Sequence, residues 1–367
     1  MNSLLESLFS VCEENHASDI HLATGQKPRF RIRGALVEKG DYRPFDVKAI
    51  DSITMDLGLV TLPLGCPDGT ERIRTTLLRD GSIDGAVSSL SGARYRFNLF
   101  RERDRHAVAL RRLDGAFHTF PELGLPRRLA DFCNEHDGLV VVTGPTGSGK
   151  STTLATMLDL INHTRPGHII TIEDPIEFLH TTDRCLVNQR QVGRDTRSFN
   201  AALIDALRED PDVILVGEIR DIDTIRTALR AAETGHLVFT TLHAGDCAGA
   251  VERLISVFPA DEQASARHQL ALVLRGIFAQ HLLPKADKTG RVPAYELLVN
   301  TAAVANLIAT GRTAQIYSLL ETNSALGMCT LEKSLTDLVL TGKIPEQTAL
   351  AFSRNAEALK RRIDRHA

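Results

Sequence analysis

Tryptophan is absent from this chain, and aromatic residues make up only 5% of it. Its six cysteines are scattered, with no C-x-x-C pair and no metal-ligand spacing. We therefore expect free thiols in a reducing compartment and assign them no chemistry. The formal net charge of −3 gives no overall attraction to nucleic acid or to anionic lipid. The cysteines are Cys12, Cys66, Cys133, Cys185, Cys247 and Cys329.

Long hydrophobic segments are also lacking. The N-terminus has neither the basic cluster nor the apolar region of a signal peptide, and Leu4, Leu5, Leu8 and Cys12 recur at the spacing of an ordinary amphipathic helix. The longest uncharged stretch near the C-terminus, 297–311, is too short and too rich in Asn and Thr to span a bilayer. We expect no signal peptide and no transmembrane helix, so that any membrane association comes through a partner.

One motif stands out among the residues that are present. The segment 144–151 reads Gly-Pro-Thr-Gly-Ser-Gly-Lys-Ser and fills every position of the phosphate-binding loop pattern, between a strand predicted at 139–143 and a helix predicted at 152–161. Backbone N–H groups in such a loop cradle phosphates. We therefore expect nucleoside triphosphate binding, with Lys150 on the β and γ phosphates and Ser151 on Mg²⁺. The alternative is a glycine-rich turn without a ligand. The predicted nucleotide-binding residues are Gly144, Pro145, Thr146, Gly147, Ser148, Gly149, Lys150, Ser151 and Thr152.

Length and patterning indicate two domains. Residues 17–113 alternate short strand-like runs with Gly and Asp turns and one helix near 44–59, which predicts an α+β module. After a turn-rich connector, alternating strand and helix signals predict an α/β domain whose largely parallel sheet is covered on both faces. From about Thr301 the pattern is helical. The predicted divisions are an N-terminal domain at 1–113, a linker at 114–126, an ATPase-like core at 127–300 and a C-terminal helical region at 301–367.

Two apolar strands predicted in the second domain end in carboxylates. The run 169–177 reads Ile-Ile-Thr-Ile-Glu-Asp-Pro-Ile-Glu, so that Pro175 stops the strand and directs the acids toward the crevice beyond the strand ends. One of these acids is suited to orient an attacking water, and the alternative is an acidic turn that caps the next segment. The run 214–218 ends in Glu218, which we assign to the metal side although the usual residue is Asp. A salt-bridged strand end is the alternative there.

Histidines and arginines form two less specific sets. His236 and His243 bracket a strand predicted at 237–241, and a satisfied core histidine is the alternative for either. Arginines crowd the end of the first domain, where they are suited to bind nucleic acid, to supply arginine fingers to a phosphate in a neighbouring subunit, or to form a solvated strand face. Few aromatic residues lie among them, which argues against a base-stacking platform. These arginines are Arg94, Arg96, Arg101, Arg103, Arg105, Arg111 and Arg112.

Taken together, four segments resemble the Walker A, Asp box, Walker B and His box motifs of secretion ATPases. In chain order they are 144–151, 171–177, 206–218 and 232–243. The resemblance extends from Ala17-Ser-Asp-Ile-His-Leu22 to Gly327-Met-Cys-Thr-Leu331 and so covers most of the chain. The chain is most similar to the PilT-like ATPases that retract type IV pili.

This resemblance implies an architecture and a set of roles. The family pairs an N-terminal PAS-like domain with a C-terminal RecA-like P-loop core in a hexameric ring, with ATP held between the two domains. Glu173 corresponds to the catalytic carboxylate and Glu218 to the Walker B acid on the Mg²⁺ side. The remaining catalytic residues implied are the His box histidines His236 and His243 and the arginine fingers Arg96 and Arg111.

Other features bear on which family member this is. Pilus assembly ATPases usually carry an extra N-terminal domain and a four-cysteine zinc site, and their absence here favours retraction. Retraction ATPases, however, typically carry two arginines in a C-terminal helical motif where this chain has Ala305 and Ala309, and the segment 240–244 reads Thr-Thr-Leu-His-Ala in place of the commoner Gly-Thr-Leu-His-Thr. An accessory pilus ATPase, or the ATPase of a type II or type IV secretion system, therefore stays open.

We accordingly predict a cytoplasmic homohexamer that hydrolyses ATP with Mg²⁺ to power type IV pilus retraction and twitching motility. It would reach the inner membrane through a pilus platform protein, without inserting itself and without binding nucleic acid. Two other classes remain: a nucleic-acid translocase that tracks along the arginine cluster, and a regulatory subunit that binds nucleotide without turnover.

Overall fold

The computed structural model describes residues 3–63, 66–113 and 115–366. The chain forms two compact units, each described here by itself. The first comprises Met1–Ala116 with Asp174–Leu179 and Arg190–Ser198, and the second comprises Phe117–Glu173, His180–Gln189 and Phe199–Ala367. The C-terminal helices therefore belong to the same unit as the phosphate-binding loop. The finer division predicted at residues 113, 126 and 300 stays a prediction.

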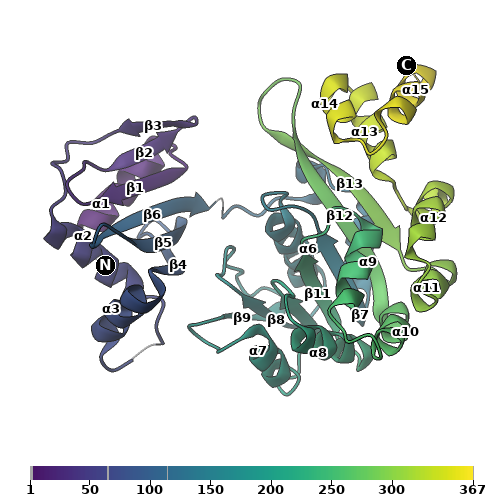
Figure 1. Ribbon diagram of the computed structural model, residues 1–367, viewed down its shortest axis with the longest axis horizontal. Coiled ribbons are helices and arrows are strands. Elements are labelled where there is room, and N and C mark those ends of the chain that lie inside the picture. The colour runs from purple at the N-terminus through teal and green to yellow at the C-terminus, as the bar shows by residue number, and fades with distance from the viewer. Residues whose placement is uncertain (1–2, 64–65, 114, 367) are drawn as a thin grey trace. The chain divides into compact units, whose positions relative to one another are not determined.

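The first unit is an α+β fold around an antiparallel sheet. Its six strands lie in the order β3-β2-β1-β6-β5-β4, and α1, α2 and α3 accompany them (Figure 1). The helices are α1 (Ser3–Glu14), α2 (Val47–Leu59) and α3 (Gly69–Asp80), and the strands are β1 (Asp19–Ala23), β2 (Arg29–Ile32), β3 (Ala35–Glu38), β4 (Ser82–Ser88), β5 (Arg94–Glu102) and β6 (Arg105–Leu113).

Alternation along these strands builds the core of this unit. In β5, Tyr95, Phe97 and Leu99 are buried while the residues between them are more exposed, as the two-residue period of a strand requires. These side chains share one apolar cluster with Phe9 of α1 and Ile53 of α2. The short strands predicted within 17–113 and the helix predicted near 44–59 are thus confirmed.

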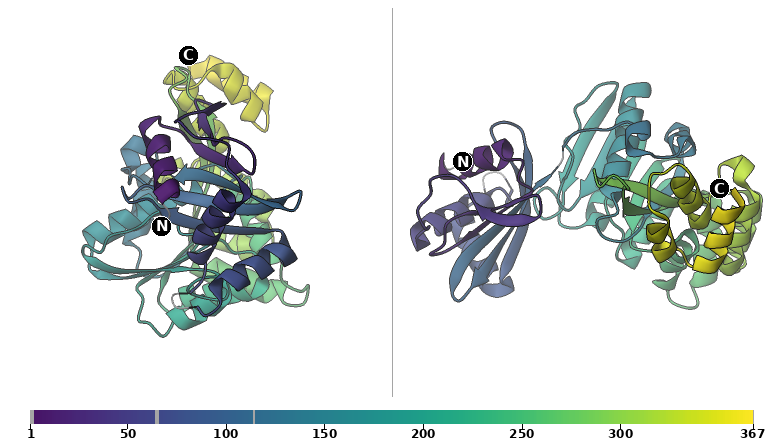
Figure 2. Two further views of the ribbon diagram at one scale, coloured as in Figure 1. Left: turned by 90° about the vertical axis from the view of Figure 1, so that its left-hand side faces the viewer. Right: turned by 90° about the horizontal axis from the view of Figure 1, so that it is seen from above.

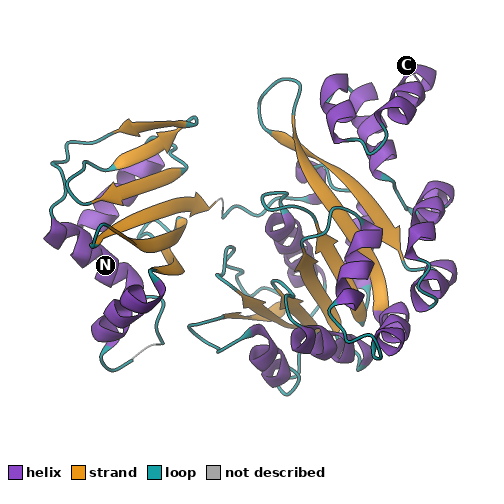
Figure 3. Cartoon of the chain, in the orientation of Figure 1, coloured by secondary structure: helices purple, strands orange, loops and turns teal. Residues whose placement is uncertain are grey.

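The second unit contains a seven-stranded mixed sheet in the order β13-β12-β7-β11-β10-β8-β9. Neighbouring pairs from β12 through β7, β11 and β10 to β8 are parallel, and β12 pairs with β13 antiparallel. Every residue of β7 and β11 is buried, because helices cover both faces of the sheet (Figure 3). The strands are β7 (Gly138–Thr143), β8 (Gly167–Glu173), β9 (Cys185–Gln191), β10 (Val213–Val216), β11 (Leu237–Leu242), β12 (Leu274–Pro284) and β13 (Arg291–Val299).

The helices of this unit connect the strands and begin at polar caps. Asp221 caps α8 through the amide of Thr224, and Asp246 caps α9 through the amide of Gly249. Around the sheet lie α4 (Phe120–Leu123), α5 (Arg127–Asp131), the short 3₁₀ helix η1 (Phe132–Asn134), α6 (Lys150–Thr164), α7 (Phe199–Ala206), α8 (Ile222–Glu233), α9 (Cys247–Ser256) and α10 (Gln263–Val273).

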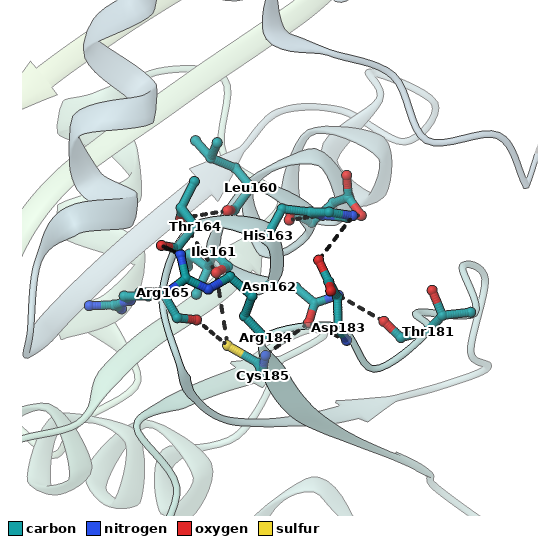
Figure 4. A network of polar contacts seen from close by, with 11 residues as sticks. Leu160, Ile161, Asn162, His163, Thr164, Arg165, Thr181, Asp183, Arg184 and Cys185 are labelled. Carbon is teal, nitrogen blue, oxygen red and sulfur yellow. Dashed lines mark hydrogen bonds and ion pairs between the residues drawn. The ribbon is translucent and has the colours of Figure 1, made fainter.

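A polar network fixes the C-terminal end of α6 to the loop that precedes β9 (Figure 4). The buried Asn162 donates to the carbonyl of Thr181 at 2.8 Å and accepts from the amides of Asp183 and Cys185 at 3.2 and 3.3 Å. The Cys185 thiol in turn donates to the carbonyl of Arg165 at 3.1 Å. The helix that follows the phosphate-binding loop is therefore held at its far end as well.

The last three helices of the chain, α13 to α15, pack on the β12–β13 hairpin (Figure 2). Leu283 and Ala294 of the hairpin share an apolar cluster with Leu335 of α13, Ala349 of α14 and Ile363 of α15. This confirms the helical pattern predicted from about residue 301. The region comprises α11 (Ala302–Ala309), η2 (Thr313–Gln315), α12 (Ile316–Thr322), η3 (Ser324–Leu326), α13 (Leu331–Leu340), α14 (Glu346–Phe352) and α15 (Ala356–His366).

Within the described ranges, none of the helices has the length and apolar character that crossing a bilayer demands. The six cysteines are free, five of them buried, in agreement with the prediction. Burial raises the pKa of the Cys133 thiol to about 12.

Candidate nucleotide site

The phosphate-binding loop joins the end of β7 to the start of α6, as predicted. Gly144 and Gly149 both have positive φ, 144° and 88°. A Cβ atom on Gly144 would collide with the carbonyl oxygen of Gln280, and one on Gly149 would lie 2.9 Å from the Gln280 side-chain nitrogen. Glycine is therefore required at both positions by backbone conformation and by the closeness of β12.

Gln280 on β12 supports this loop through hydrogen bonds, and no motif in the sequence pointed to it. Its amide nitrogen donates to the carbonyl of Ser148, and its oxygen accepts from the Thr153 hydroxyl at 2.7 Å. All three side chains are only 2% exposed. The signal in the sequence is a polar residue inside an apolar strand, since a buried amide needs partners.

Lys150 and His243 meet at the mouth of the loop. The Lys150 ammonium donates to the carbonyls of Gly144 and Pro145 at 2.9 and 3.1 Å, and it lies 3.5 Å from Nδ1 of His243. Because an ammonium only donates, Nδ1 of His243 is the acceptor and the ring proton is on Nε2. That nitrogen lies 3.3 Å from Oε1 of Glu218. Lys150, His243 and Glu218 thus form one chain of contacts.

Glu218 is held in its charged form. Burial raises its pKa, but the hydrogen bond and charge of Arg220 and the neighbouring His243 and Lys150 outweigh burial and lower it below the usual value. The Arg220 guanidinium lies 2.7 Å from Oε2 of Glu218, and the Glu218 side chain is 19% exposed. The predicted alternative, a salt-bridged strand end, therefore describes part of its environment, while its other oxygen faces His243.

Two threonines join the strand ends that carry these groups. The Thr143 hydroxyl on β7 lies 2.9 Å from both the amide nitrogen and the carbonyl oxygen of Ala244, so it accepts from one and donates to the other. The Thr241 hydroxyl on β11 donates to the carbonyl of Gly217 at 2.5 Å. The loop with His243 is thereby tied to the phosphate-binding strand on one side and to the Glu218 segment on the other.

Glu173 ends β8, one strand beyond β10 in the sheet. Its Oε1 accepts hydrogen bonds from the Thr171 hydroxyl at 2.7 Å and from the Gln189 amide at 3.2 Å. Glu173 and Glu218 therefore both lie at the carboxyl edge of the parallel strands, where ligands of such sheets bind. The two hydrogen bonds fix the carboxylate in one orientation.

Within the second unit, the structure does not bring His236 to this edge of the sheet. His236 lies at the start of β11, the opposite end from His243, and its Nδ1 is 3.0 Å from the carbonyl of Ala231. Arg96 and Arg111 are exposed neighbours on β5 and β6 of the first unit. Arg111 donates to Asp19 at 2.9 Å. Catalytic roles for these three residues stay predictions.

The donor set at the loop fits a hard divalent cation. Ser151 is exposed at the start of α6, and Glu218 supplies an ionised carboxylate, so both offer the oxygen ligands that Mg²⁺ prefers. No cluster of three or more His, Cys, Asp or Glu side chains suited to hold a metal occurs in the part of the chain that the structure describes.

Comparison with known proteins decides the family. The family model described as Type II/IV secretion system protein matches residues 1–341. The chain belongs to this family. Its relatives in the Type II/IV secretion system protein family include the type IV pilus retraction ATPase PilT of Pseudomonas aeruginosa, which is 41% identical over 345 residues, 94% of this chain and 96% of that protein.

Two further matches of the Type II/IV secretion system family bear on function. The type IV pilus ATPase PilU of Pseudomonas aeruginosa is 36% identical over 357 residues, 97% of this chain and 90% of that protein. A crystal structure of the pilus retraction motor PilT with bound ADP has a TM-score of 0.86 at 41% identity, and the match covers 98% of this chain and 100% of that one. The predicted fold class and the resemblance to PilT-like ATPases are confirmed.

Proposed function

We propose that this chain is an ATPase motor that powers type IV pilus retraction and thereby twitching motility. The observation that carries the proposal is the chain of contacts from Lys150 through His243 to Glu218 at the phosphate-binding loop. This arrangement places the group that binds phosphate near the acid on the metal side, and hydrolysis of a phosphate anhydride uses both. The similarity to a retraction ATPase over nearly the whole chain supports pilus retraction as the work that ATP hydrolysis drives.

The protein's own residues act by binding and orienting. Backbone amides of 144–151 and the N-terminal end of α6 attract the phosphates, and Lys150 adds a positive charge. Glu173, held by Thr171 and Gln189, accepts a hydrogen bond from the attacking water and aligns it. Through its contact with Glu218, His243 holds that carboxylate in place beside the phosphate-binding loop. Ser151 and Glu218 would hold Mg²⁺, which when bound spreads the charge on the phosphate oxygens.

The assembly and partners are part of the same proposal. A hexameric ring would let Arg96 or Arg111 serve as arginine fingers, which suits their exposure on the first unit. An inner-membrane pilus platform protein would receive the motion and hold the otherwise cytoplasmic ring at the membrane. This arrangement needs no segment of the chain in the bilayer.

Replacing Glu173 by Gln tests the enzymatic part. The variant should bind ATP with unchanged affinity and lose turnover by at least about 100-fold, because shape is kept while the charge that orients water is lost. Phosphate release and ATP binding are measured side by side. Glu233→Gln, the same change at an exposed position on α8, is the matched control and should behave as the unaltered protein. Near-normal turnover by Glu173→Gln would refute the role of Glu173.

An accessory pilus motor is the second function that an observation favours. Ala305 and Ala309 on α11 replace two arginines typical of retraction motors, and PilU matches the chain over 97% of its length. Deleting the gene in its host and counting surface filaments separates the options. More filaments with fewer retractions support the principal retraction motor, and loss of retraction only under load supports the accessory one. Lost filaments or lost export would refute retraction.

A further inference from the structure

A charged cluster outside the nucleotide site links the C-terminal helices to the loop that follows β11. Arg354 lies between α14 and α15, and its guanidinium contacts Asp246 at 2.9 Å and Glu296 at 3.2 Å. Asp246 is the last residue of the loop 243–246, which begins at His243, and Glu296 is on β13. Three segments far apart in sequence are therefore joined by one side chain.

The two acids that Arg354 contacts both hold the start of α9. Asp246 accepts from the amide of Gly249 at 2.6 Å, and Glu296, only 3% exposed, accepts from the amide of Cys247 at 3.2 Å. They thus satisfy two of the free N–H groups that begin the helix. The position of this helix start sets the position of the loop 243–246 in front of it.

Arg354 is the one positive partner described for this cluster. Glu332 of α13 adds a further negative charge, which interacts electrostatically with both Glu296 and Arg354. Its Oε2 accepts a hydrogen bond from the Tyr317 hydroxyl at 2.9 Å. Removing Arg354 would leave Asp246, Glu296 and Glu332 as neighbouring acids without compensation. Asp246, whose side chain is 30% exposed, is the freest of the three to move once its ion pair with Arg354 is lost.

A second contact makes the same connection. Nε2 of His281 on β12 donates to the carbonyl of Gly245 at 3.1 Å, and the His281 ring packs edge-on against Phe352 of α14, with 6.3 Å between ring centroids. The loop 243–246 is therefore touched by the α14–α15 segment directly through Arg354 and indirectly through His281. At its other end the same loop places His243 against Glu218 and Lys150.

We propose that Arg354 is a positioning residue for His243, so that the C-terminal helices α13–α15 set the geometry of the nucleotide site through the loop 243–246. The inference rests on the proposed function, since it assigns His243 a part in turnover. Movement of α14 and α15 against the hairpin would alter the Asp246 contact and with it the His243–Glu218 contact. A partner that binds these helices would then change the rate of ATP hydrolysis from outside the site.

The test is a double-mutant cycle on ATP turnover with Arg354→Gln, His243→Ala and the double variant. Arg354→Gln should lower kcat roughly three- to tenfold and leave ADP affinity within about twofold. In the His243→Ala background it should add less than about twofold, because the residue through which it acts is gone. Arg354→Lys should restore part of the rate, and Arg361→Gln on the exposed face of α15 should leave it unchanged.

Hydrogen exchange supplies a readout besides activity. The amides of 247–249 should exchange faster in Arg354→Gln than in Arg361→Gln, at equal thermal midpoints of the two proteins. Equal rate losses in both His243 backgrounds, or unchanged kcat and exchange, would overturn the inference while the proposed function stands. Normal turnover by His243→Ala would instead remove the role of His243 in the proposed function, and the inference with it.

Discussion

Replacing Gln280 by Met tests how far the phosphate-binding loop depends on β12. Methionine has nearly the volume of glutamine but lacks its amide, so the change leaves little cavity. It strands the carbonyl of Ser148 and the hydroxyl of Thr153, both in residues only 2% exposed. An unsatisfied buried polar group costs about 1–3 kcal/mol, so the two together predict a loss of about 2–6 kcal/mol in the free energy of unfolding of the second unit.

The loss should appear in two measurements. A unit of this size changes its thermal midpoint by about 2–4 °C per kcal/mol, so the midpoint of the nucleotide-free protein should fall by at least about 4 °C. ADP affinity should fall by about tenfold or more, because the loop amides lose the support that aims them at the phosphates. Thr153→Val removes one of the two bonds and should lower the midpoint by roughly half as much.

Controls define what would refute this reasoning. Gln269→Met is the same substitution at a surface hydrogen bond to Glu233 and should change stability by less than about 0.5 kcal/mol. Combining Gln280→Met with Thr153→Val should cost less than the sum of the two, since both break the same bond. If Gln280→Met matched the unaltered protein in midpoint and ADP affinity, β12 would not support the loop.

Two further predictions concern stability. Burial outweighs the attraction of Arg354 and raises the pKa of Glu296 from 4.5 to about 7. Between these two pH values the folded protein keeps a proton on Glu296 that the unfolded chain releases. The free energy of unfolding should therefore fall by roughly 3 kcal/mol as the pH rises from 4.5 to 7. Glu296→Gln removes this titration, and its unfolding free energy should fall less between pH 5 and pH 8; an unchanged pH dependence in denaturant titrations would contradict this. Asn162→Leu should lower the thermal midpoint by about 4–12 °C, because the Thr181 carbonyl and the amides of Asp183 and Cys185 lose their partner. The control is Asn188→Leu, at an exposed hydrogen bond on β9, which should shift the thermal midpoint by less than about 2 °C.

The parts of the site that follow from sequence are those carried by contiguous motifs. The loop at 144–151, Glu173 and Glu218 each adjoin an apolar run that predicts a strand, and the carboxyl ends of parallel strands meet at one edge. Lys150 and His243 could be placed near each other on the same grounds. The fold class followed from the switch between short strands and helical periods.

The supporting contacts could not be predicted in the same way. Gln280 lies more than a hundred positions from the loop that it holds, and only the register of β12 beside β7 brings them together. Arg354 lies between two short helices whose packing on the hairpin depends on apolar contacts without a motif. His236 shows the converse: its place in a recognised segment is clear, yet its strand position puts it at the other end from His243.

The number of residues that precede Gln280 and His281 in β12 decides on which face of the sheet each of them lies. Its neighbouring residues Gln280 and His281 point to opposite faces of the sheet, one to the phosphate-binding loop and the other to Gly245. A single residue inserted before them in β12 would exchange the two faces and uncouple both loops at once. A change in length would leave both contacts in place if it fell beyond them, in the turn that follows the strand. Within that turn the amide of Ala286 donates to the carbonyl of Lys343 at 2.9 Å, so residues 287–289 are the place where an insertion or a fluorescent label should be tolerated.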